Sequence, residues 1–326
     1  MGKIIAITGA AGYLGRVLIA HLLTQSWVER IIALDVKPVL ADGRVISHSL
    51  DIREVSSLRA ILAEHGVTHF VHAAFIINKP ADMGVEQMRS INVDGSQLAL
   101  KTAFELGVEQ ITFISSVSVY GYRGGNPVLV HENHRSWPNM LYAQHKMQVE
   151  TYLRDLEPHY PDTRTLTIRP AAIAGPQGRT VSPLLALVAQ PVFVLSNGGH
   201  ARTQAVHEDD LARLISRGLE INAAGIFNAS PNDHGTWAEI AAISRRRPLS
   251  LPRPVLNIAA HLSPFIPDLR GFTREIVDYF SESLVVDNSF AKQTLGWTPQ
   301  FGTLDAFGQL FGVKQSPREQ RIGATR

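Results

Sequence analysis

The sequence predicts an α/β protein built on a doubly wound parallel sheet, with a smaller mixed lobe at its carboxyl-terminal end. In the first half of the chain, short apolar runs rich in β-branched residues alternate with longer segments of helical periodicity. The apolar runs are continuous, as expected of strands buried on both faces of a parallel sheet, and right-handed helical crossovers then give the doubly wound arrangement. We expect strands at residues 3–8, 30–35, 45–48, 69–72, 110–115 and 164–168, and helices at residues 12–25, 55–64, 84–106 and 139–156.

The second part of the chain carries a weaker pattern. After Pro170 the strand patterns become short and scattered. We therefore expect residues 1–170 to form one domain, to which segments near 203–228 return, and residues 171–314 to form mainly the smaller lobe. In this part a helix is expected at 209–219, a strand at 225–228 and a helix at 288–295. The tail, residues 315–326, is polar and aperiodic, which is typical of disorder.

Composition excludes several classes of protein. Lysine and arginine total 31 against 29 aspartate and glutamate, a net charge of +2, so the chain lacks the concentrated basic face of a nucleic-acid binder. The absence of cysteine excludes disulfides, thiolate metal sites and a cysteine nucleophile. The longest apolar stretch, residues 181–195, contains Pro183 and Pro191 and is shorter than the ~20 residues that span a bilayer. We therefore expect a cytoplasmic protein without nucleic-acid or membrane partners.

The strongest local motif is the segment Thr8-Gly9-Ala10-Ala11-Gly12-Tyr13-Leu14-Gly15, which follows the first strand and opens a helix. Glycine lets the backbone turn tightly and approach a pyrophosphate, whose charge is favoured at a helix N-terminus. Asp35 ends the next strand, where a carboxylate accepts hydrogen bonds from a ribose diol and repels a 2′-phosphate. Val36 stands where an NADP enzyme often has arginine. The pattern predicts a dinucleotide site for NAD rather than NADP.

A second motif, Tyr142-Ala143-Gln144-His145-Lys146, places a phenol and an ammonium on one face of a helix. A free phenol, with a pKa of about 10, is a poor base at neutral pH, and a nearby positive charge lowers that pKa. On its own this spacing is common on ordinary helices. Here Ser116 follows the strand at 110–115, at the end of the sheet where ligands bind, so its hydroxyl can hold a substrate beside Tyr142. The three side chains together predict proton transfer to or from an alcohol or carbonyl.

These motifs resemble those of the extended short-chain dehydrogenase/reductases, and within them the NAD-dependent epimerase/dehydratase family. The resemblance implies a Rossmann fold, NAD as the cofactor, and a homodimer packed through the helices at 84–106 and 139–156. It spans residues 4–307 and includes the further segments Asp51-Ile52-Arg53, His72-Ala73-Ala74, Asn92-Val93-Asp94-Gly95-Ser96, Arg169-Pro170, Val206-His207-Glu208-Asp209-Asp210 and Leu295-Gly296-Trp297-Thr298-Pro299.

The resemblance also implies roles for individual residues. Tyr142 would be the general acid or base, Lys146 would bind the nicotinamide ribose and lower the pKa of Tyr142, and Ser116 would orient the substrate. Asn92 would support the site from the helix beneath it, and Asp51 would approach the adenine. The residues implied in cofactor binding are Gly9, Gly12, Tyr13, Leu14, Gly15, Asp35, Asp51, Ile52, Ala73, Ala74 and Lys146.

Departures from the family's patterns bear on the reaction. Val117 and Ser118 occupy the positions of the acidic pair of 4,6-dehydratases, so water elimination lacks its general acid and base. Compared with UDP-galactose 4-epimerases, Ala172 replaces an asparagine and Thr203 replaces an arginine suited to a pyrophosphate. The nearest alternative anchor by sequence is Arg202, and the further candidates are Arg179 and Arg270.

We predict reversible oxidation of a secondary hydroxyl on a sugar or nucleotide sugar, by an epimerase, with Ser118 and Arg202 as substrate contacts. The alternative is a dehydrogenase or reductase of an apolar alcohol, of the 3β-hydroxysteroid or dihydroflavonol type. For that alternative the apolar residues of 249–280 would form a substrate wall, although core packing of the smaller lobe is the simpler interpretation. A third hypothesis is a protein that binds NAD without catalysis. The complete set of Ser116, Tyr142 and Lys146 argues against it.

No metal centre is expected. The segment His131-Glu132-Asn133-His134 lacks the helical spacing of zinc proteases, and no third ligand is evident. A Gly-x-Ser-x-Gly nucleophile elbow is absent too, so a hydrolase based on Ser116 would lack its structural context.

Overall fold

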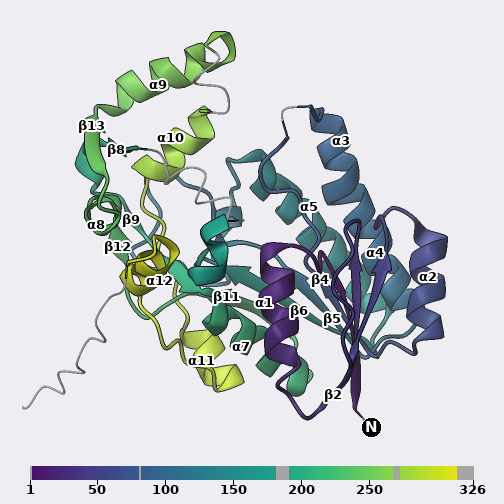
Figure 1. The fold of residues 1–326 in the computed structure, drawn as a ribbon. Coiled ribbons are helices and arrows are strands. Elements are labelled where there is room, and N and C mark those ends of the chain that lie inside the picture. The colour runs from purple at the N-terminus through teal and green to yellow at the C-terminus, as the bar shows by residue number, and fades with distance from the viewer. Residues whose placement is uncertain (1, 81, 181–190, 267–271, 314–326) are drawn as a thin grey trace, which may run out of the picture.

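The computed structural model describes residues 2–80, 82–180, 191–266 and 272–313, which form a large parallel sheet with helices on both faces and a second group of elements beside it (Figure 1). The sheet has seven strands in the order β11-β6-β5-β4-β1-β2-β3, and every neighbouring pair is parallel. The predicted doubly wound α/β fold is confirmed. The strands are β1 (Lys3–Thr8), β2 (Val28–Asp35), β3 (Val45–Ser49), β4 (His69–His72), β5 (Gln110–Ile114), β6 (Arg164–Pro170) and β11 (Gly225–Ala229).

Side chains alternate across the sheet, so each face has its own core. In β1, Ile5 and Ile7 belong to one core and Ala6 belongs to the other. Because both cores are aliphatic and fully covered, the strands appear in the sequence as continuous apolar runs. The first core is covered by α1 (Tyr13–Leu22), α7 (Glu208–Glu220) and α11 (Ser289–Leu295), and the second by α2 (Val55–Glu64), α4 (Ser96–Glu105) and α5 (Leu141–Leu156).

The segment predicted as one helix at residues 84–106 is interrupted in the structure. It consists of α3 (Val85–Arg89), a π-helix (Ser90–Gly95) and α4. A π-helical turn holds one residue more than an α-turn and is frequent at functional sites. Periodicity does not reveal such a turn, because the apolar stripe continues on either side of it. The other expected helices and strands of the first half agree with the structure to within three residues at each end.

The second group of elements is built from small sheets that the sequence pattern did not predict. Three two-stranded sheets pair distant segments, and two of them are parallel. Trp237 lies fully buried in the core of this group. The strands are β7 (Ala172–Ala174) with β10 (Ala205–His207), β9 (Arg202–Thr203) with β12 (Gly235–Thr236), and β8 (Val192–Ser196) with β13 (Arg247–Leu251); the helices are α8 (Trp237–Ile243), α9 (Arg253–Leu262), α10 (Arg274–Ser281) and α12 (Thr303–Leu310).

The apolar segment 249–280 is only partly buried. Leu256 packs with Val277 in a small core, in agreement with the packing interpretation. Other apolar side chains of the expected set, such as Ile258 and Phe265, are exposed, so that interpretation is wrong for them. The predicted disordered tail at 315–326 lies outside the described residues. Within the described part of the chain, no helix is long and apolar enough to cross a bilayer.

Candidate active site

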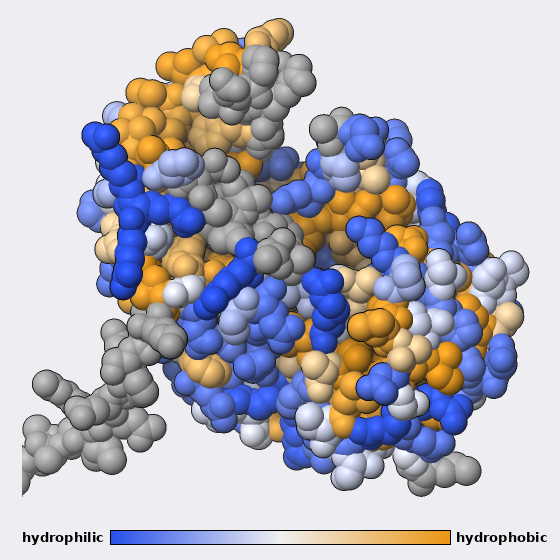
Figure 2. All heavy atoms as spheres, in the orientation of Figure 1, coloured by the Kyte–Doolittle hydropathy of each residue, from blue (hydrophilic) through white to orange (hydrophobic). Residues whose placement is uncertain are grey.

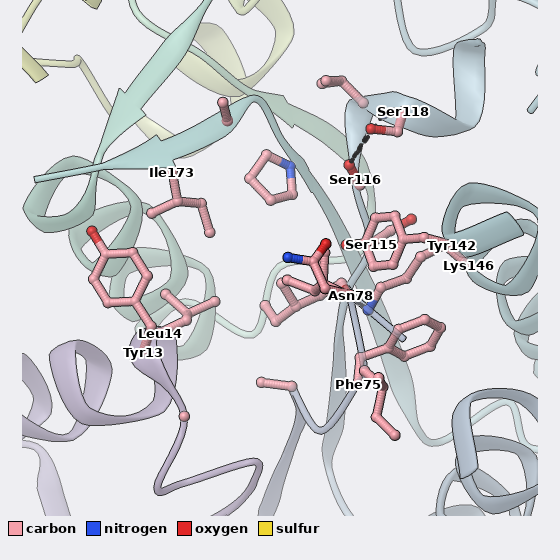
Figure 3. A pocket seen from close by; sticks show the side chains of 18 of the residues that line it. Tyr13, Leu14, Phe75, Asn78, Ser115, Ser116, Ser118, Tyr142, Lys146 and Ile173 are labelled. Carbon is pink, nitrogen blue, oxygen red and sulfur yellow. Dashed lines mark hydrogen bonds between the residues drawn. The ribbon is translucent and has the colours of Figure 1, made fainter. Parts of the chain in front are cut away.

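A cavity of about 730 Å³ opens at the carboxyl ends of the central strands. It extends from the glycine-rich loop after β1, past the loops after β4 and β5, to α10 of the second group of elements. Figure 3 shows Tyr13 and Leu14 on one side of the cavity, and Ser116, Tyr142 and Lys146 gathered on the other. This edge of an open parallel sheet is where ligands of such folds bind.

The glycine-rich loop is packed so closely that side chains are excluded. Gly9 has φ +72°, and a Cβ there would lie 2.6 Å from the amide nitrogen of Ala74. A Cβ on Gly15 would lie 2.3 Å from the carbonyl oxygen of Gly9, so helix α1 also approaches the loop without room for a side chain. Gly9, Gly12 and Gly15 all line the cavity, which gives a bound group direct access to the loop backbone.

Asp35 fastens this loop to the end of β2. One carboxylate oxygen accepts a hydrogen bond from the amide of Ala11 at 3.0 Å, and the other accepts one from the amide of Lys37 at 3.0 Å. Asp51 lies farther along the same edge, where Arg53 holds the pKa of its carboxyl below the usual value through a 2.6 Å ion pair. The loop and the two carboxylates therefore lie at one end of the sheet.

A chain of hydrogen bonds connects the glycine loop with the π-helix. Thr8 Oγ1 lies 2.8 Å from Nδ1 of His72, and His72 Nε2 lies 2.8 Å from Oγ of Ser96. Ser96 donates to the carbonyl oxygen of Asn92 at 2.6 Å, and Thr8 Oγ1 accepts from the amides of Ala73 and Ala74 at 3.2 and 3.3 Å. Burial, with a smaller contribution from the positive charge of Lys146, lowers the pKa of His72 to about 3.

The side chain of Asn92 forms two hydrogen bonds with the backbone of the loop after β4. Its side-chain oxygen accepts from the amide of Ile76 at 2.7 Å, and its side-chain nitrogen donates to the carbonyl of Ile76 at 2.8 Å. The amide is fully buried and does not belong to the described lining of the cavity. Asn92 thus holds the backbone between Phe75 and Ile77, which line the cavity on both sides of Ile76.

The hydroxyl groups after β5 form a short row on the cavity wall. Ser116 Oγ accepts a hydrogen bond from the amide of Ser118 at 3.1 Å, and its hydroxyl donates to Ser118 Oγ at 3.1 Å. Ser118 Oγ lies 3.3 Å from the hydroxyl of Tyr122. This row is formed because a 3₁₀ turn, Val117–Tyr120, begins directly after Ser116 and returns the chain toward it.

Tyr142 lies in the first turn of α5 beside this row (Figure 3). Its ring meets the ring of Phe75 edge-on, with centroids 5.5 Å apart at 89°. Burial raises the pKa of the Tyr142 phenol, and the neighbouring Ser116 hydroxyl opposes this. The phenol is therefore protonated at neutral pH in the protein alone.

Lys146 follows one turn later and is buried against the sheet. Its Nζ donates to the carbonyl of Ile114 at 2.6 Å and lies 3.5 Å from the centroid of the Phe75 ring. Burial lowers the pKa of Lys146, and the negative charge of Glu150 opposes this. Glu150 is itself paired with Arg169 at 2.5 Å beneath the site.

The comparison with protein families shows to which family this chain belongs. The model of the NAD dependent epimerase/dehydratase family matches residues 5–229 of this chain. The chain belongs to this family. NAD is accordingly its cofactor, and the resemblance inferred from the motifs is confirmed.

Individual relatives are more distant. An uncharacterized protein of Mycobacterium tuberculosis (strain H37Rv) is 27% identical over 323 residues, covering 95% of this chain and 83% of the relative. The 3 beta-hydroxysteroid dehydrogenase/Delta 5-->4-isomerase of monkeypox virus is 28% identical over 153 residues, 44% of each chain. Among solved structures, MoeE5 in complex with UDP-glucuronic acid and NAD has a TM-score of 0.75 at 18% identity, with 95% of this chain and 98% of MoeE5 covered. The UDP-glucose 4-epimerase of Thermotoga maritima has a TM-score of 0.73 at 18% identity, with the same coverage.

The residues of this family member fit NAD. The closely packed glycine loop provides a surface of backbone amides, and the cavity continues from it to Lys146 without interruption. Tyr13, Leu14 and Ala73 also line the cavity, as do Ser116, Ser118 and Tyr142. Of the other predicted residues, Asp35, Asp51, Ile52, Ala74 and Arg202 are not among the described residues that line it.

Three arginines were considered as pyrophosphate anchors, and neither Arg202 nor Arg179 is among the described residues that line the cavity. Arg202 is in β9, where its backbone amide donates to Ser283 Oγ at 2.9 Å. Arg179 donates from Nε to the carbonyl of Gln309 at 2.9 Å. Arg270 lies outside the described residues.

Three aromatic residues of the site, Phe75, Tyr122 and Tyr279, were not found by sequence reasoning. Tyr122 and Tyr279 both line the cavity, and their rings meet at 4.8 Å and 69°. Burial raises the pKa of Tyr122 to about 12, so its hydroxyl remains protonated. Tyr122 follows Ser116 closely enough to have been considered, whereas Tyr279 of α10 carries no recognisable motif.

Proposed function

We propose that this protein catalyses NAD-dependent oxidation and reduction at a carbon that carries a secondary hydroxyl. The observation that carries the proposal is the position of Ser116, Tyr142 and Lys146 on one wall of a cavity that begins at the glycine loop. A protein that only binds NAD has no need for this set. We also propose that the part up to residue 170 binds mainly the cofactor, that 171–314 binds mainly the substrate, and that the chain forms a homodimer.

In the proposed oxidation, Ser116 and Tyr142 hold the substrate hydroxyl between them. The hydroxyl proton passes to the Tyr142 oxygen, which must first be deprotonated, and the hydrogen on the same carbon leaves as hydride. Bound NAD⁺ supplies the hydride acceptor. The Lys146 ammonium, whose Nζ lies 5.8 Å from the centroid of the Tyr142 ring, would stabilise the phenolate electrostatically. The Ser116 hydroxyl would donate to the phenolate after turning away from Ser118. Reduction is the reverse, with neutral Tyr142 as the proton donor.

The described residues of the cavity favour an apolar alcohol as the substrate. Much of the cavity lining is formed by aliphatic and aromatic side chains. Within this described lining, the positive side chains are Lys37, which follows Asp35, and Lys146, which is bonded to Ile114. Neither is placed to bind a substrate pyrophosphate. This apolar lining includes Phe75, Ile76, Ile77 and Ile276, together with Tyr279. Ile173 belongs to the side of the cavity where Tyr13 and Leu14 lie (Figure 3).

A nucleotide sugar is the second candidate, with epimerisation as the reaction. It is supported by the similarity of almost the whole fold to MoeE5 and to the Thermotoga epimerase, which bind UDP-sugars in the structures compared. In an epimerase the keto intermediate is reduced again on the other face, and the nucleotide must remain anchored meanwhile. Arg202 would have to reorient toward the cavity to serve as that anchor.

A titration and a turnover assay separate the candidates. NAD-loaded protein is titrated with UDP, and NADH is followed on a panel of hydroxysteroids and aromatic secondary alcohols. An apolar-alcohol enzyme should accumulate NADH and show no response to UDP. UDP binding that is weakened by Arg202→Ala would instead support the nucleotide sugar. If neither class of substrate is turned over while NAD binds, the catalytic proposal itself fails.

A further inference from the structure

Helix α9 presents a row of apolar side chains to solvent. Val255, Ile258 and Leu262 are 46, 61 and 43% exposed, and Phe265 in the following turn is 80% exposed. Their spacing of three, four and three residues places them on one side of the helix. We refer to these four residues as the α9 face. Figure 2 shows an apolar area at the end of the molecule where α9 lies in Figure 1.

The opposite side of α9 fixes the helix in place. Leu256 and Ala260 are buried and pack with Val277 of α10. Arg253, at the first position of α9, forms a 2.7 Å ion pair with Asp278 and a second one with Glu282. The α9 face is therefore held outward by a helix that is anchored on its other side.

The stretch of sequence that contains the α9 face carries arginines but no carboxylates. Residues 240–266 contain four arginines and no aspartate or glutamate. Arg253 is paired as described, whereas Arg245 and Arg247 are exposed, and the described residues provide no ion-pair partner for either. Arg245 and Arg247 precede Val255 by ten and eight residues. An exposed apolar row that follows such arginines is complementary to a surface that is apolar beneath and negatively charged outside.

We propose that the α9 face docks on the surface of an anionic lipid bilayer. Short amphipathic helices bind there by inserting apolar side chains below the headgroups, while nearby arginines are attracted to anionic lipids. A second copy of the chain fits less well, because the exposed Arg245 and Arg247 of the two copies would repel one another. The sequence-based expectation of no membrane partner considered only segments that span or enter a bilayer, and this type of contact lies outside that search.

The position of α9 connects this surface with the cavity. Ile276 and Tyr279 of α10 line the cavity, and Val277 between them packs under α9. In the docked protein, α9 would lie on the lipid, and α10 behind it would form the wall of the cavity. That arrangement suits an apolar alcohol dissolved in the bilayer, and this last step alone rests on the proposed function.

The test is sedimentation of the full-length protein with vesicles. Vesicles of phosphatidylcholine with phosphatidylglycerol should pellet the protein, vesicles of phosphatidylcholine alone should pellet much less, and added salt should release it. Ile258→Ser combined with Phe265→Ser should weaken binding about tenfold or more. Arg245→Gln and Arg247→Gln should each weaken it about fivefold.

Matched controls are available in the same chain. Leu40→Ser changes an apolar residue that is 93% exposed far from α9 in the sequence, and Arg154→Gln changes an exposed arginine of α5; neither should alter vesicle binding. NAD binding and the thermal midpoint of every variant verify the fold. Because sedimentation needs no substrate, its outcome is independent of the proposed function.

Two results would overturn the proposal. One is absence of sedimentation with anionic vesicles, or sedimentation that the α9 variants do not reduce beyond the controls. The other is a concentration-dependent dimer that the Ile258→Ser and Phe265→Ser changes dissociate, which would assign the face to a second copy of this chain or, by extension, to a protein partner.

Discussion

Ser116 should control the acidity of Tyr142, and Ser116→Ala tests this. In the structure the Ser116 hydroxyl donates to Ser118, and when turned toward Tyr142 it would donate to the phenolate oxygen, which lowers a phenol pKa that burial has raised. A hydrogen bond to a charged group contributes about 1.5–3 kcal/mol, which corresponds to roughly one to two pKa units. Removing it should raise the pKa of Tyr142 by that amount and slow oxidation at neutral pH by about 10- to 100-fold.

The assay is the pH dependence of kcat/KM in both directions. Oxidation needs the phenolate, so its rate rises with pH, and in Ser116→Ala this rise should move to higher pH by about one to two units. Reduction needs the neutral phenol, so at neutral pH it should lose only the orienting effect of the hydroxyl. Ser115→Ala is the matched control, because Ser115 donates to Glu150 instead and does not contact Tyr142.

A uniform loss would refute this reasoning. If Ser116→Ala lowers the plateau that oxidation reaches at high pH by the same factor as the rate at neutral pH, without moving the rise, then Ser116 only positions the substrate and does not act on the phenol. An equal shift in Ser115→Ala would show that any loss of a hydroxyl near the sheet edge disturbs the site.

Other substitutions probe the remaining parts of the site. Tyr142→Phe should lower turnover by roughly 10²–10⁴-fold and leave the Kd for NAD nearly unchanged, whereas Lys146→Met should impair both; wild-type turnover in Tyr142→Phe would assign the proton to another residue. Asp35→Ala should narrow the preference for NAD over NADP, because it removes a negative charge and leaves Lys37 on the cavity wall; tighter binding of NADP than NAD by the unaltered protein would contradict this. His72 has a pKa of about 3 in the folded protein against 6.5 for the free side chain, so the unfolded chain binds more protons below pH 6.5. The free energy of unfolding should therefore fall, from this residue alone, by about 1.4 kcal/mol for each pH unit below 6.5, and His72→Asn should show a smaller fall in urea titrations.

The parts of the fold that the sequence predicted are those in which local and tertiary preferences coincide. The run from Lys3 to Thr8 is apolar because both of its faces are covered. The glycines after it are required because a Cβ on Gly15, for example, would lie 2.3 Å from the carbonyl oxygen of Gly9. The motifs around Ser116, Tyr142 and Lys146 were visible for a similar reason, since each lies at the end of a predicted strand or in a predicted helix.

The parts that could not be predicted depend on partners distant in sequence. Tyr279 meets Tyr122 only because α10 packs over the cavity, and no periodicity in the second half of the chain indicates that contact. Ile258 and Leu256 have the same apolar character, yet one is exposed and the other buried. Composition cannot distinguish them, because the difference arises from which side of α9 meets Val277.

The hydrogen bonds between Thr8, His72 and Ser96 connect the glycine loop, at the cofactor end of the cavity, with the helix that carries Asn92. Ser96 gives its only hydrogen to a carbonyl, so the imidazole must donate from Nε2 and accept at Nδ1, and Thr8 must point its hydrogen at the ring. Every hydrogen along the path then has a single direction, and the ring has a single tautomer. The loop that carries the glycines and the loop that contains Ile76 are therefore connected by hydrogen bonds of fixed direction through an uncharged imidazole.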